Sequence, residues 1–419
     1  MVKSIFAVKG ISYTLKNLRQ LISSFPKSTG SVAVVSQKRI NHQWSVWSSE
    51  LPSVHPFYAV KSNPEPTLLQ TLVNRGASFD CASIREIHDV TKMYWNNDEK
   101  RPDIIYAHPM KSTKDIHLVK DSGIDVTVVD SVEECDKLLA CDWKGSAFLR
   151  VAVDDSGSKM PFSSKFGATH EEVEVISRRS KIPISGVSFH VGSGCQDPTQ
   201  YERAIDYSAG HVFDVLRKYG HNPKVIDIGG GFSANLQEFR PAAASIRKAL
   251  EKVPKNRKVI AEPGRFFAQP SHDLFVKVIA KKPGKDRSWR YIIDESLYGY
   301  FSSIVFDHQR PPWFRVSVNE AEKERRTSDA ILFGRTCDSL DVIARGKMEE
   351  LEVGDWLYFP MMGAYTSATA SEFNGFPKPY LLNDSENVLP HTNDCWEWMR
   401  EFNKDTKNIK YSNALPPIV

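Results

Sequence analysis

The chain has 419 residues, of which 41% are hydrophobic and 25% are charged, a composition typical of soluble globular proteins that excludes wholesale disorder. This length exceeds what one hydrophobic core usually holds, so we expect one large and one smaller domain. Lys and Arg number 55 against 51 Asp and Glu, and the net charge of +4 is too weak to indicate binding to nucleic acid or to a membrane surface.

The N-terminal region, residues 1–36, contains an amphipathic stretch at residues 15–22 and a β-rich run at residues 31–36. It lacks the apolar segment of a signal peptide, and no apolar run in the chain approaches the roughly 20 residues of a membrane span. The six cysteines lack CxxC or CxxH spacing, which argues against a zinc site and a dense disulfide framework. We therefore expect a reduced, cytoplasmic protein.

From residue 55 onward, short β-rich runs alternate with stretches of helical periodicity. The helical stretches are residues 66–74, 85–94, 113–120, 132–139, 170–179, 199–219 and 236–253. The β-rich runs are residues 55–60, 77–83, 103–109, 125–131, 147–153, 186–192, 224–231 and 258–264. This alternation predicts an α/β fold with a (β/α)8 barrel over residues 37–275, although a doubly wound sheet shows the same alternation.

The pattern changes in the C-terminal third of the chain. Residues 281–285, KKPGK, are typical of a linker. The clearest strand-like runs that follow are residues 289–294, 313–318, 329–333 and 355–359, without long helices between them. We therefore expect a β domain over residues 276–419, to which the N-terminal residues 1–36 add a strand.

In a (β/α)8 barrel, functional side chains lie at the carboxyl ends of the strands. The residues predicted there are Lys61, Asp80, His108, Arg150, His190, Gly229, Gly230, Gly231, Glu262, Pro263, Gly264 and Arg265. A metal site would need several converging carboxylates or histidines, and no second acid lies near these histidines. This set therefore indicates an organic cofactor and no metal.

Lys61 follows an apolar strand, so a partly buried, nucleophilic amine would enter the barrel mouth, as covalent attachment of a carbonyl compound requires. The glycines at 229–231 would let backbone amides approach a phosphate, with Ser193 as a second candidate. Taken alone, Lys61 could be a surface lysine and the glycines a tight turn.

Glu262 could accept a hydrogen bond from a protonated pyridine nitrogen, and Arg265 could bind phosphate through two hydrogen bonds. His190 could lie flat against an aromatic ring. The alternatives are a surface ion pair between Glu262 and Arg265 and a core histidine. Together, the amine, the ring partner, the anion cradle and the carboxylate predict pyridoxal phosphate as the cofactor.

These residues lie in segments that resemble the fold-type III pyridoxal-phosphate decarboxylases, and within them the eukaryotic ornithine decarboxylases. The similar segments are PFYAVK at 56–61, FDCAS at 79–83, FHVGSG at 189–194, DIGGGF at 227–232 and EPGR at 262–265. The resemblance covers roughly residues 30–402. It implies that pyridoxal 5'-phosphate is attached to Lys61 and bound by Asp80, Arg150, His190, Ser193, Gly230, Gly231, Glu262, Pro263, Gly264 and Arg265, with Lys61 and His190 catalytic.

Three segments of the β domain also resemble this family: FDH at 306–308, TCDSLD at 336–341 and GAYT at 363–366. The resemblance implies that Asp307 and Asp338 hold the distal ammonium of a basic amino acid. It further implies a phosphate contact for Tyr365 and substrate contacts for Phe306 and Phe373.

The resemblance makes Cys337 the group that protonates the substrate carbon after carbon dioxide leaves. In this family Cys337 and Asp338 reach the site of the neighbouring subunit, which implies a homodimer with shared sites. From the sequence alone, Cys337 could be a buried cysteine and Asp338 a turn residue.

We therefore expect a decarboxylase that converts a basic L-amino acid, with L-ornithine and its product putrescine as the first choice. Lysine, arginine or diaminopimelate decarboxylation and a specialised paralogue are the enzymatic alternatives, and diaminopimelate is disfavoured because its distal carboxylate would meet Asp307 and Asp338. A catalytically inactive regulatory paralogue is the alternative from another class. Departures from the family pattern at Arg335, at His108 and at residues 295–297 affect the substrate more than the activity. The sequence does not reveal whether an inhibitory partner protein binds.

Overall fold

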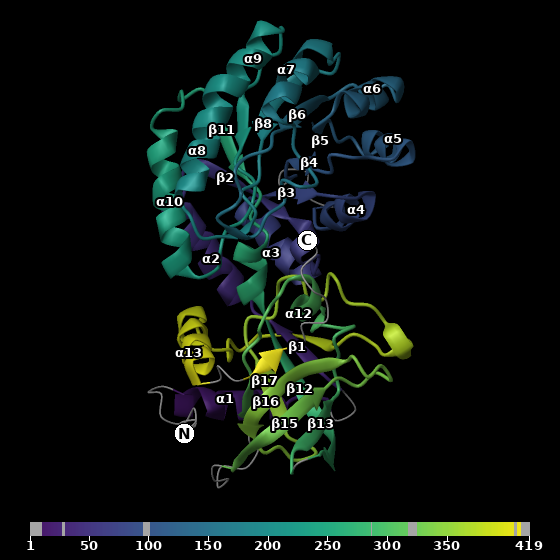
Figure 1. The fold of residues 1–419 in the computed structure, drawn as a ribbon, viewed down its shortest axis with the longest axis vertical. Coiled ribbons are helices and arrows are strands. Elements are labelled where there is room, and N and C mark those ends of the chain that lie inside the picture. Colours follow the sequence, from purple (N-terminus) through teal and green to yellow (C-terminus); the bar gives the residue numbers. More distant parts are fainter. Residues whose placement is uncertain are drawn as a thin grey trace. The chain divides into compact units, whose positions relative to one another are not determined.

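The computed structural model describes residues 11–26, 30–94, 101–285, 287–316, 325–405 and 409–411. The chain divides into two compact units, Asn41–Phe267 and the combination of Met1–Ile40 with Ala268–Val419 (Figure 1). The boundaries that the sequence suggests, at residues 37 and 275, stay predictions. Within these described segments, no helix has the length and apolar character needed to cross a bilayer.

The first unit is a closed barrel of eight parallel strands, as the alternation of strands and helices predicts (Figure 1). Neighbouring strands follow one another in chain order, and the last strand pairs with the first through Ile260 and His55. The strands are β2 (Val54–Ala59), β3 (Ser78–Cys81), β4 (Ile104–Tyr106), β5 (Val126–Val129), β6 (Ser146–Arg150), β8 (Ile184–Ser188), β10 (Val225–Asp227) and β11 (Lys258–Ala261).

The helices between these strands begin at residues that suit helix N-termini. Ser83, Ser112, Ser131 and Thr169 each accept a hydrogen bond from a backbone amide in the first turn, which satisfies one of the free donors there. The helices of this unit are α2 (Gln37–Glu50), α3 (Pro66–Arg75), α4 (Ile84–Lys92), α5 (Thr113–Asp121), α6 (Val132–Ala140), α7 (His170–Arg179), α8 (Thr199–Tyr207), α9 (Phe213–Lys218), α10 (Leu236–Leu250) and α11 (Arg265–Ala268). The unit boundaries after Ile40 and Phe267 fall within α2 and α11.

The barrel interior is a packed apolar core. Phe57, Ile105, Val128, Phe148 and Ile260 point inward from five strands and are at most 4% exposed. Because all eight strands run in the same direction, the residues that follow their carboxyl ends share one mouth of this filled barrel. That mouth is where the predicted cofactor residues lie.

The second unit is built on a nine-stranded sheet, so the prediction of a β domain is confirmed. Its strands are β1 (Val32–Val35), β12 (His272–Pro283), β13 (Trp289–Ile293), β14 (Phe314–Val316), β15 (Thr327–Phe333), β16 (Val342–Glu349), β17 (Trp356–Phe359), β18 (Tyr380–Asn383) and β19 (Lys410–Tyr411). The N-terminal strand β1 pairs antiparallel with β12 and parallel with β18, which confirms that the N-terminus contributes to this domain.

One expectation for this unit was wrong. Residues 281–285 are not a linker, because β12 continues to Pro283 and pairs with β13 as far as Trp289. The second half of β12 is largely exposed, so its polar side chains resemble those of a connecting segment. Between residues 289 and 359, the described part of the chain contains only the five-residue helix α12 (Ser302–Phe306), so the expected lack of long helices there is confirmed. The longer helices α1 (Ile11–Ser23) and α13 (Thr392–Asp405) lie outside this stretch.

A buried ion pair joins distant segments of this unit. Both terminal nitrogens of Arg39 bind the carboxylate of Asp273, at 2.7 and 2.9 Å, and Arg39 also donates to the carbonyl of Pro390. Arg39 and Asp273 are 3% and 0% exposed. Tyr358 donates a further hydrogen bond to Asp273, so the start of α2, β12, β17 and the segment before α13 share one polar network.

Candidate active site

The side chain of Lys61 lies directly after β2, where Nζ donates a hydrogen bond to Oδ2 of Asp80 at 2.7 Å. Asp80 is 1% exposed, whereas the Lys61 side chain is 45% exposed and therefore reachable from solvent. The second oxygen of Asp80, Oδ1, is buried and finds no hydrogen-bond donor among the described residues. An accessible amine is thus held by a buried carboxylate at the mouth of the barrel.

Two further acids lie at the ends of the adjacent strands β10 and β11. Glu262 follows β11, and its backbone amide donates to the carbonyl of Gly229 at 2.6 Å. Burial raises the pKa of Glu262, and Asp80 raises it further, while Lys61 and Arg150 lower it. The fully buried carboxyl of Asp227 lies within hydrogen-bonding reach of Glu262, and burial and Glu262 raise its pKa far above the ordinary value.

The backbone at Gly230 packs closely against the side chain of His190 and the carbonyl of Glu262. A Cβ atom on Gly230 would lie 2.8 Å from Nε2 of His190 and 2.9 Å from the carbonyl of Glu262, so only glycine fits. Gly231 has a φ of +95°, which also favours glycine. Burial, together with Arg150 and Lys61, lowers the pKa of His190 well below its ordinary value, so its ring is neutral.

The loop after β6 contributes two aromatic residues that lie outside the motifs identified in the sequence. Phe162 packs against the ring of His190 with a centroid distance of 5.0 Å, and Phe166 lies 5.2 Å from the guanidinium of Arg150. A small antiparallel pairing of β7 (Ser158–Met160) with β9 (Ser193–Cys195) fixes this loop. The same pairing places Ser193 beside Met160.

The remaining predicted barrel residues lie at the same mouth. The carbonyl of Pro263 accepts a hydrogen bond from Ala59, and a Cβ on Gly264 would come within 3.1 Å of Ser62. Arg265 opens the short helix α11. Pro263 and Gly264 therefore lie against residues at and just after the end of β2, close in sequence to Lys61.

In the β unit, two predicted residues, Asp338 and Phe373, contact Tyr298. Its hydroxyl donates to Asp338 and lowers the pKa of that carboxyl. Its ring stacks on Phe373 with a centroid distance of 4.3 Å. Cys337 is exposed and its amide donates to Asn374 at 3.0 Å. Tyr298 is a third residue that the sequence reasoning missed, because only the fold brings it to Asp338.

Three other predicted residues of this unit lie on separate segments. Phe306 ends α12 (Ser302–Phe306) and is 62% exposed, and the following Asp307 accepts a hydrogen bond from Gln309. Tyr365 has a φ of +54°, an uncommon conformation for a side chain of this size. A backbone conformation of this kind is retained where surrounding structure fixes it.

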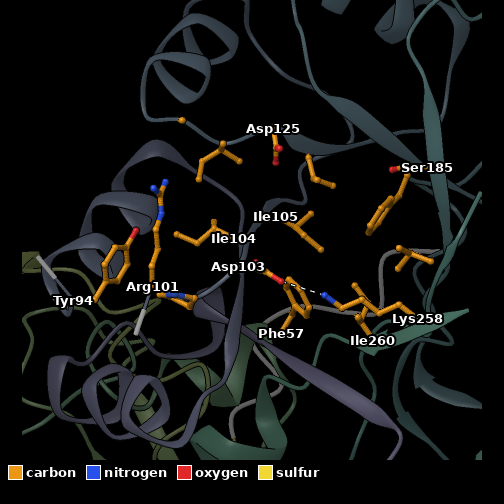
Figure 2. A pocket seen from close by; sticks show the side chains of 16 residues that line it. Phe57, Tyr94, Arg101, Asp103, Ile104, Ile105, Asp125, Ser185, Lys258 and Ile260 are labelled. Atoms are coloured by element: carbon orange, nitrogen blue, oxygen red, sulfur yellow. Dashed lines mark hydrogen bonds and ion pairs between the residues drawn. The ribbon is translucent and has the colours of Figure 1, made fainter. Parts of the chain in front are cut away.

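A hollow of about 470 Å³ lies at the opposite, amino-terminal ends of the barrel strands. Figure 2 shows its lining, with the ion pair between Lys258 and Asp103. Its floor consists of core side chains such as Phe57 and Phe148. None of the predicted cofactor residues lines it, so the chemistry of the candidate site belongs to the other mouth.

The residues at that mouth fit pyridoxal 5'-phosphate. Lys61 offers the amine for attachment, and the neutral His190, which lies against Gly230, offers a flat ring for stacking. Asp80 and Glu262 supply negative charge that a protonated ring nitrogen would neutralise. The orphaned oxygen of Asp80 agrees with a site that lacks one hydrogen-bonding group.

Comparison with known proteins shows what the chain is similar to. Residues 37–269 match the family model described as the pyridoxal-binding domain of pyridoxal-dependent decarboxylases. The ornithine decarboxylase of Caenorhabditis elegans is 34% identical over 402 residues, which are 90% of each chain. The arginine decarboxylase of Paramecium bursaria Chlorella virus superposes with a TM-score of 0.81 at 33% identity, covering 88% of this chain and all of that one. The lysine/ornithine decarboxylase of Vibrio vulnificus, complexed with cadaverine, has a TM-score of 0.78 at 32% identity, covering 88% and 98%.

Proposed function

Because the chain belongs to the family of pyridoxal-dependent decarboxylases, we propose that it removes the α-carboxyl group of L-ornithine and releases putrescine. The observation that carries this proposal is the cluster at the barrel mouth, where the Lys61 amine, the Asp80 carboxylate and Glu262 lie together. The similarity to ornithine decarboxylases over most of the chain supports ornithine as the substrate.

When bound, pyridoxal 5'-phosphate supplies the ring that withdraws the electron pair of the breaking bond between Cα and the carboxylate. Lys61 provides the amine for its attachment, and Asp80 orients that amine. Glu262 would accept a hydrogen bond from the ring nitrogen, and the neutral His190 would pack against the ring without adding positive charge. The phosphate group of the cofactor would be bound by the backbone amides of Gly230 and Gly231 and by the side chains of Ser193, Arg265 and Tyr365.

The β unit provides the substrate groups in this proposal. Asp307 and Asp338 would bind the distal ammonium through charge-assisted hydrogen bonds, with Phe306 and Phe373 covering the aliphatic part. The thiol of Cys337 would return a proton to Cα after carbon dioxide leaves. These roles follow from the family motifs around 306–308 and 336–341.

We assign the functional form as a homodimer with shared sites. In a single chain Leu340, near Cys337, is 68% exposed, Phe306 is 62% exposed and Phe373 is 41% exposed. Exposed apolar side chains around a proposed catalytic thiol are typical of a surface that a second copy covers. A cytoplasmic location is part of the same proposal.

The substrate is tested by measuring carbon dioxide release from ornithine, lysine and arginine with added cofactor. We expect the highest kcat/KM with ornithine and a smaller value with lysine, because one methylene typically changes specificity by about 1–3 kcal/mol. The fold-neighbour from Vibrio vulnificus is named for both lysine and ornithine, so lysine is the second candidate. A higher kcat/KM with lysine than with ornithine would identify lysine as the substrate. If no carbon dioxide were released from any of the three amino acids, the catalytically inactive regulatory paralogue would be favoured.

Asp338→Asn tests the substrate groups. Losing one charge-assisted contact of about 1.5–3 kcal/mol should lower kcat/KM for ornithine roughly 10- to 150-fold, while the cofactor absorbance remains. Asp329→Asn on the exposed side of β15 is the matched control. An unchanged kcat/KM in Asp338→Asn would show that Asp338 does not bind the substrate.

A further inference from the structure

Asp227 is a fully buried acid whose role the family motifs leave unassigned. It ends β10, between β8 and β11, and is 0% exposed. Its Oδ1 accepts a hydrogen bond from the amide of Gly229 at 2.9 Å, but Oδ2 finds no donor among the described residues. A buried carboxylate oxygen without a donor is costly, so this carboxyl needs either a proton or a partner.

Glu262 is the group that faces it. The amide of Ile228 donates to the carbonyl of Ile260 at 2.9 Å, and the amide of Glu262 donates to Gly229 at 2.6 Å. These two bonds hold the ends of β10 and β11 together and bring the two carboxyl groups within hydrogen-bonding reach. Two carboxyl groups at this distance bond only when one of them carries a proton.

The surroundings place that proton on Asp227. Asp227 has no exposed surface, and the other acids oppose its ionisation. Glu262 is partly exposed and is stabilised as an anion by Lys61 and Arg150. The charged and titratable groups that face the pair are Lys61 after β2, Asp80 in β3, Arg150 in β6 and the neutral His190 after β8. With Asp227 neutral, the two anions Asp80 and Glu262 balance the two cations Lys61 and Arg150.

We propose that Asp227 is a positioning residue whose neutral carboxyl group donates a hydrogen bond to Glu262 and thereby holds Glu262 as an oriented anion for the ring nitrogen of the cofactor. The inference rests on the proposed function, since it assigns Glu262 to that nitrogen. Oδ1 would keep the Gly229 amide, while the protonated Oδ2 would serve Glu262. Both oxygens of Asp227 would then be satisfied.

The first test compares Asp227→Asn with Asp227→Ala in the full-length chain, freed of cofactor and titrated with pyridoxal 5'-phosphate. Asn keeps an acceptor for Gly229 and a neutral donor for Glu262, so its apparent dissociation constant should stay within roughly threefold of wild type. Ala removes the donor to a charged group and should weaken binding roughly 10- to 100-fold. Ser188→Ala, which deletes an unbonded buried hydroxyl on the neighbouring strand β8, is the control and should bind like wild type. Equal losses for Asn and Ala, or no loss for Ala, would overturn the proposal.

The second test separates positioning from a merely structural role. In a Glu262→Gln background, Asp227→Ala should cost less than roughly threefold in cofactor affinity, because its effect passes through Glu262. The same loss in both backgrounds would show that Asp227 only supports the glycine segment, and the proposal would fall.

A third measurement decides the matter if the Ala variant does not fold. Asp227 is protonated in the folded chain and ionised when unfolded, so its contribution to wild-type stability should fall as pH rises above the ordinary carboxyl pKa of 3.8, and Asp227→Asn should remove that contribution of about one proton. Parallel stability curves for the two proteins would contradict a neutral Asp227. These readouts need no turnover, so a wild-type protein that binds the cofactor but releases no carbon dioxide would defeat the proposed function alone.

Discussion

Replacing Glu295 with Gln should make the β unit more stable at alkaline pH. Glu295 is 1% exposed, and burial raises the pKa of its carboxyl from 4.5 to about 7, although three hydrogen bonds partly offset this effect. Oε1 accepts the amides of Ser296 and Tyr300, and Oε2 accepts the hydroxyl of Ser31. Gln preserves this pattern, because its amide oxygen can accept both amides and its nitrogen can donate to Ser31.

The magnitude follows from proton linkage. Because the pKa of Glu295 is higher in the folded state than in the unfolded state, the folded state holds an extra proton between about pH 4.5 and 7. The stabilisation is complete below about pH 4.5 and is lost as pH rises through 7. A difference between a pKa of 4.5 and a pKa of about 7 corresponds to at most about 3.5 kcal/mol, at about 1.4 kcal/mol for each pH unit.

The assay is urea unfolding of wild type and Glu295→Gln at pH 5, 6, 7 and 8. The two proteins should have similar unfolding free energies at pH 5, and the variant should be more stable by about 1–3 kcal/mol at pH 8. Asp294, whose pKa burial raises to about 6, titrates in both proteins, so its contribution largely cancels in the difference. A difference that is the same at pH 5 and pH 8, or a wild type that is the more stable protein at pH 8, would refute this reasoning.

Three further predictions concern catalysis, assembly and stability. Lys61→Ala should abolish both carbon dioxide release and the visible absorbance of attached cofactor, and retention of both would refute its role. Mixing inactive Lys61→Ala and Cys337→Ala proteins should restore about a quarter of wild-type activity, because random exchange makes about half the dimers mixed and each mixed dimer has one intact site. No recovery despite subunit exchange, verified by mass spectrometry of tagged chains, would exclude shared sites. Arg39→Met should lower the unfolding free energy of the β unit by about 3–5 kcal/mol in urea titrations, because it leaves Asp273 buried without its cation. An unchanged midpoint would show that Tyr358 alone satisfies Asp273.

The barrel could be predicted from the sequence because each strand is a short apolar run followed by a helix with its own start signal. The same regularity places Lys61 and Glu262 at one mouth, since position along a parallel strand decides which end a residue reaches. Contacts made by irregular segments could not be predicted in this way. Phe162 reaches His190 only because β7 pairs with β9, and Tyr298 reaches Asp338 across 40 residues.

The protonation of Asp227 is also invisible in a sequence. An aspartate in a sequence can be a surface carboxylate or a buried neutral acid, and only the packing of β10 against β11 distinguishes the two for Asp227. The end of β12 was misassigned for a related reason, because an exposed strand edge and a linker select the same polar residues. Sequence patterns therefore reveal which face is buried more readily than how polar groups pair.

The position of β1 has a consequence for how the chain is made. Val32–Val35 is an entirely buried strand, yet its partners β12 and β18 begin at His272 and Tyr380. At about 5–20 residues per second, translation takes roughly 10–50 s to travel from β1 to β12. During that interval the barrel segments can already pair with one another, while the four apolar residues of β1 have no partner strand in the chain made so far. Such a segment is prone to pair with other chains. Slow elongation, or termination close to residue 268, would therefore leave a folded barrel with an unpaired, aggregation-prone segment at residues 32–35.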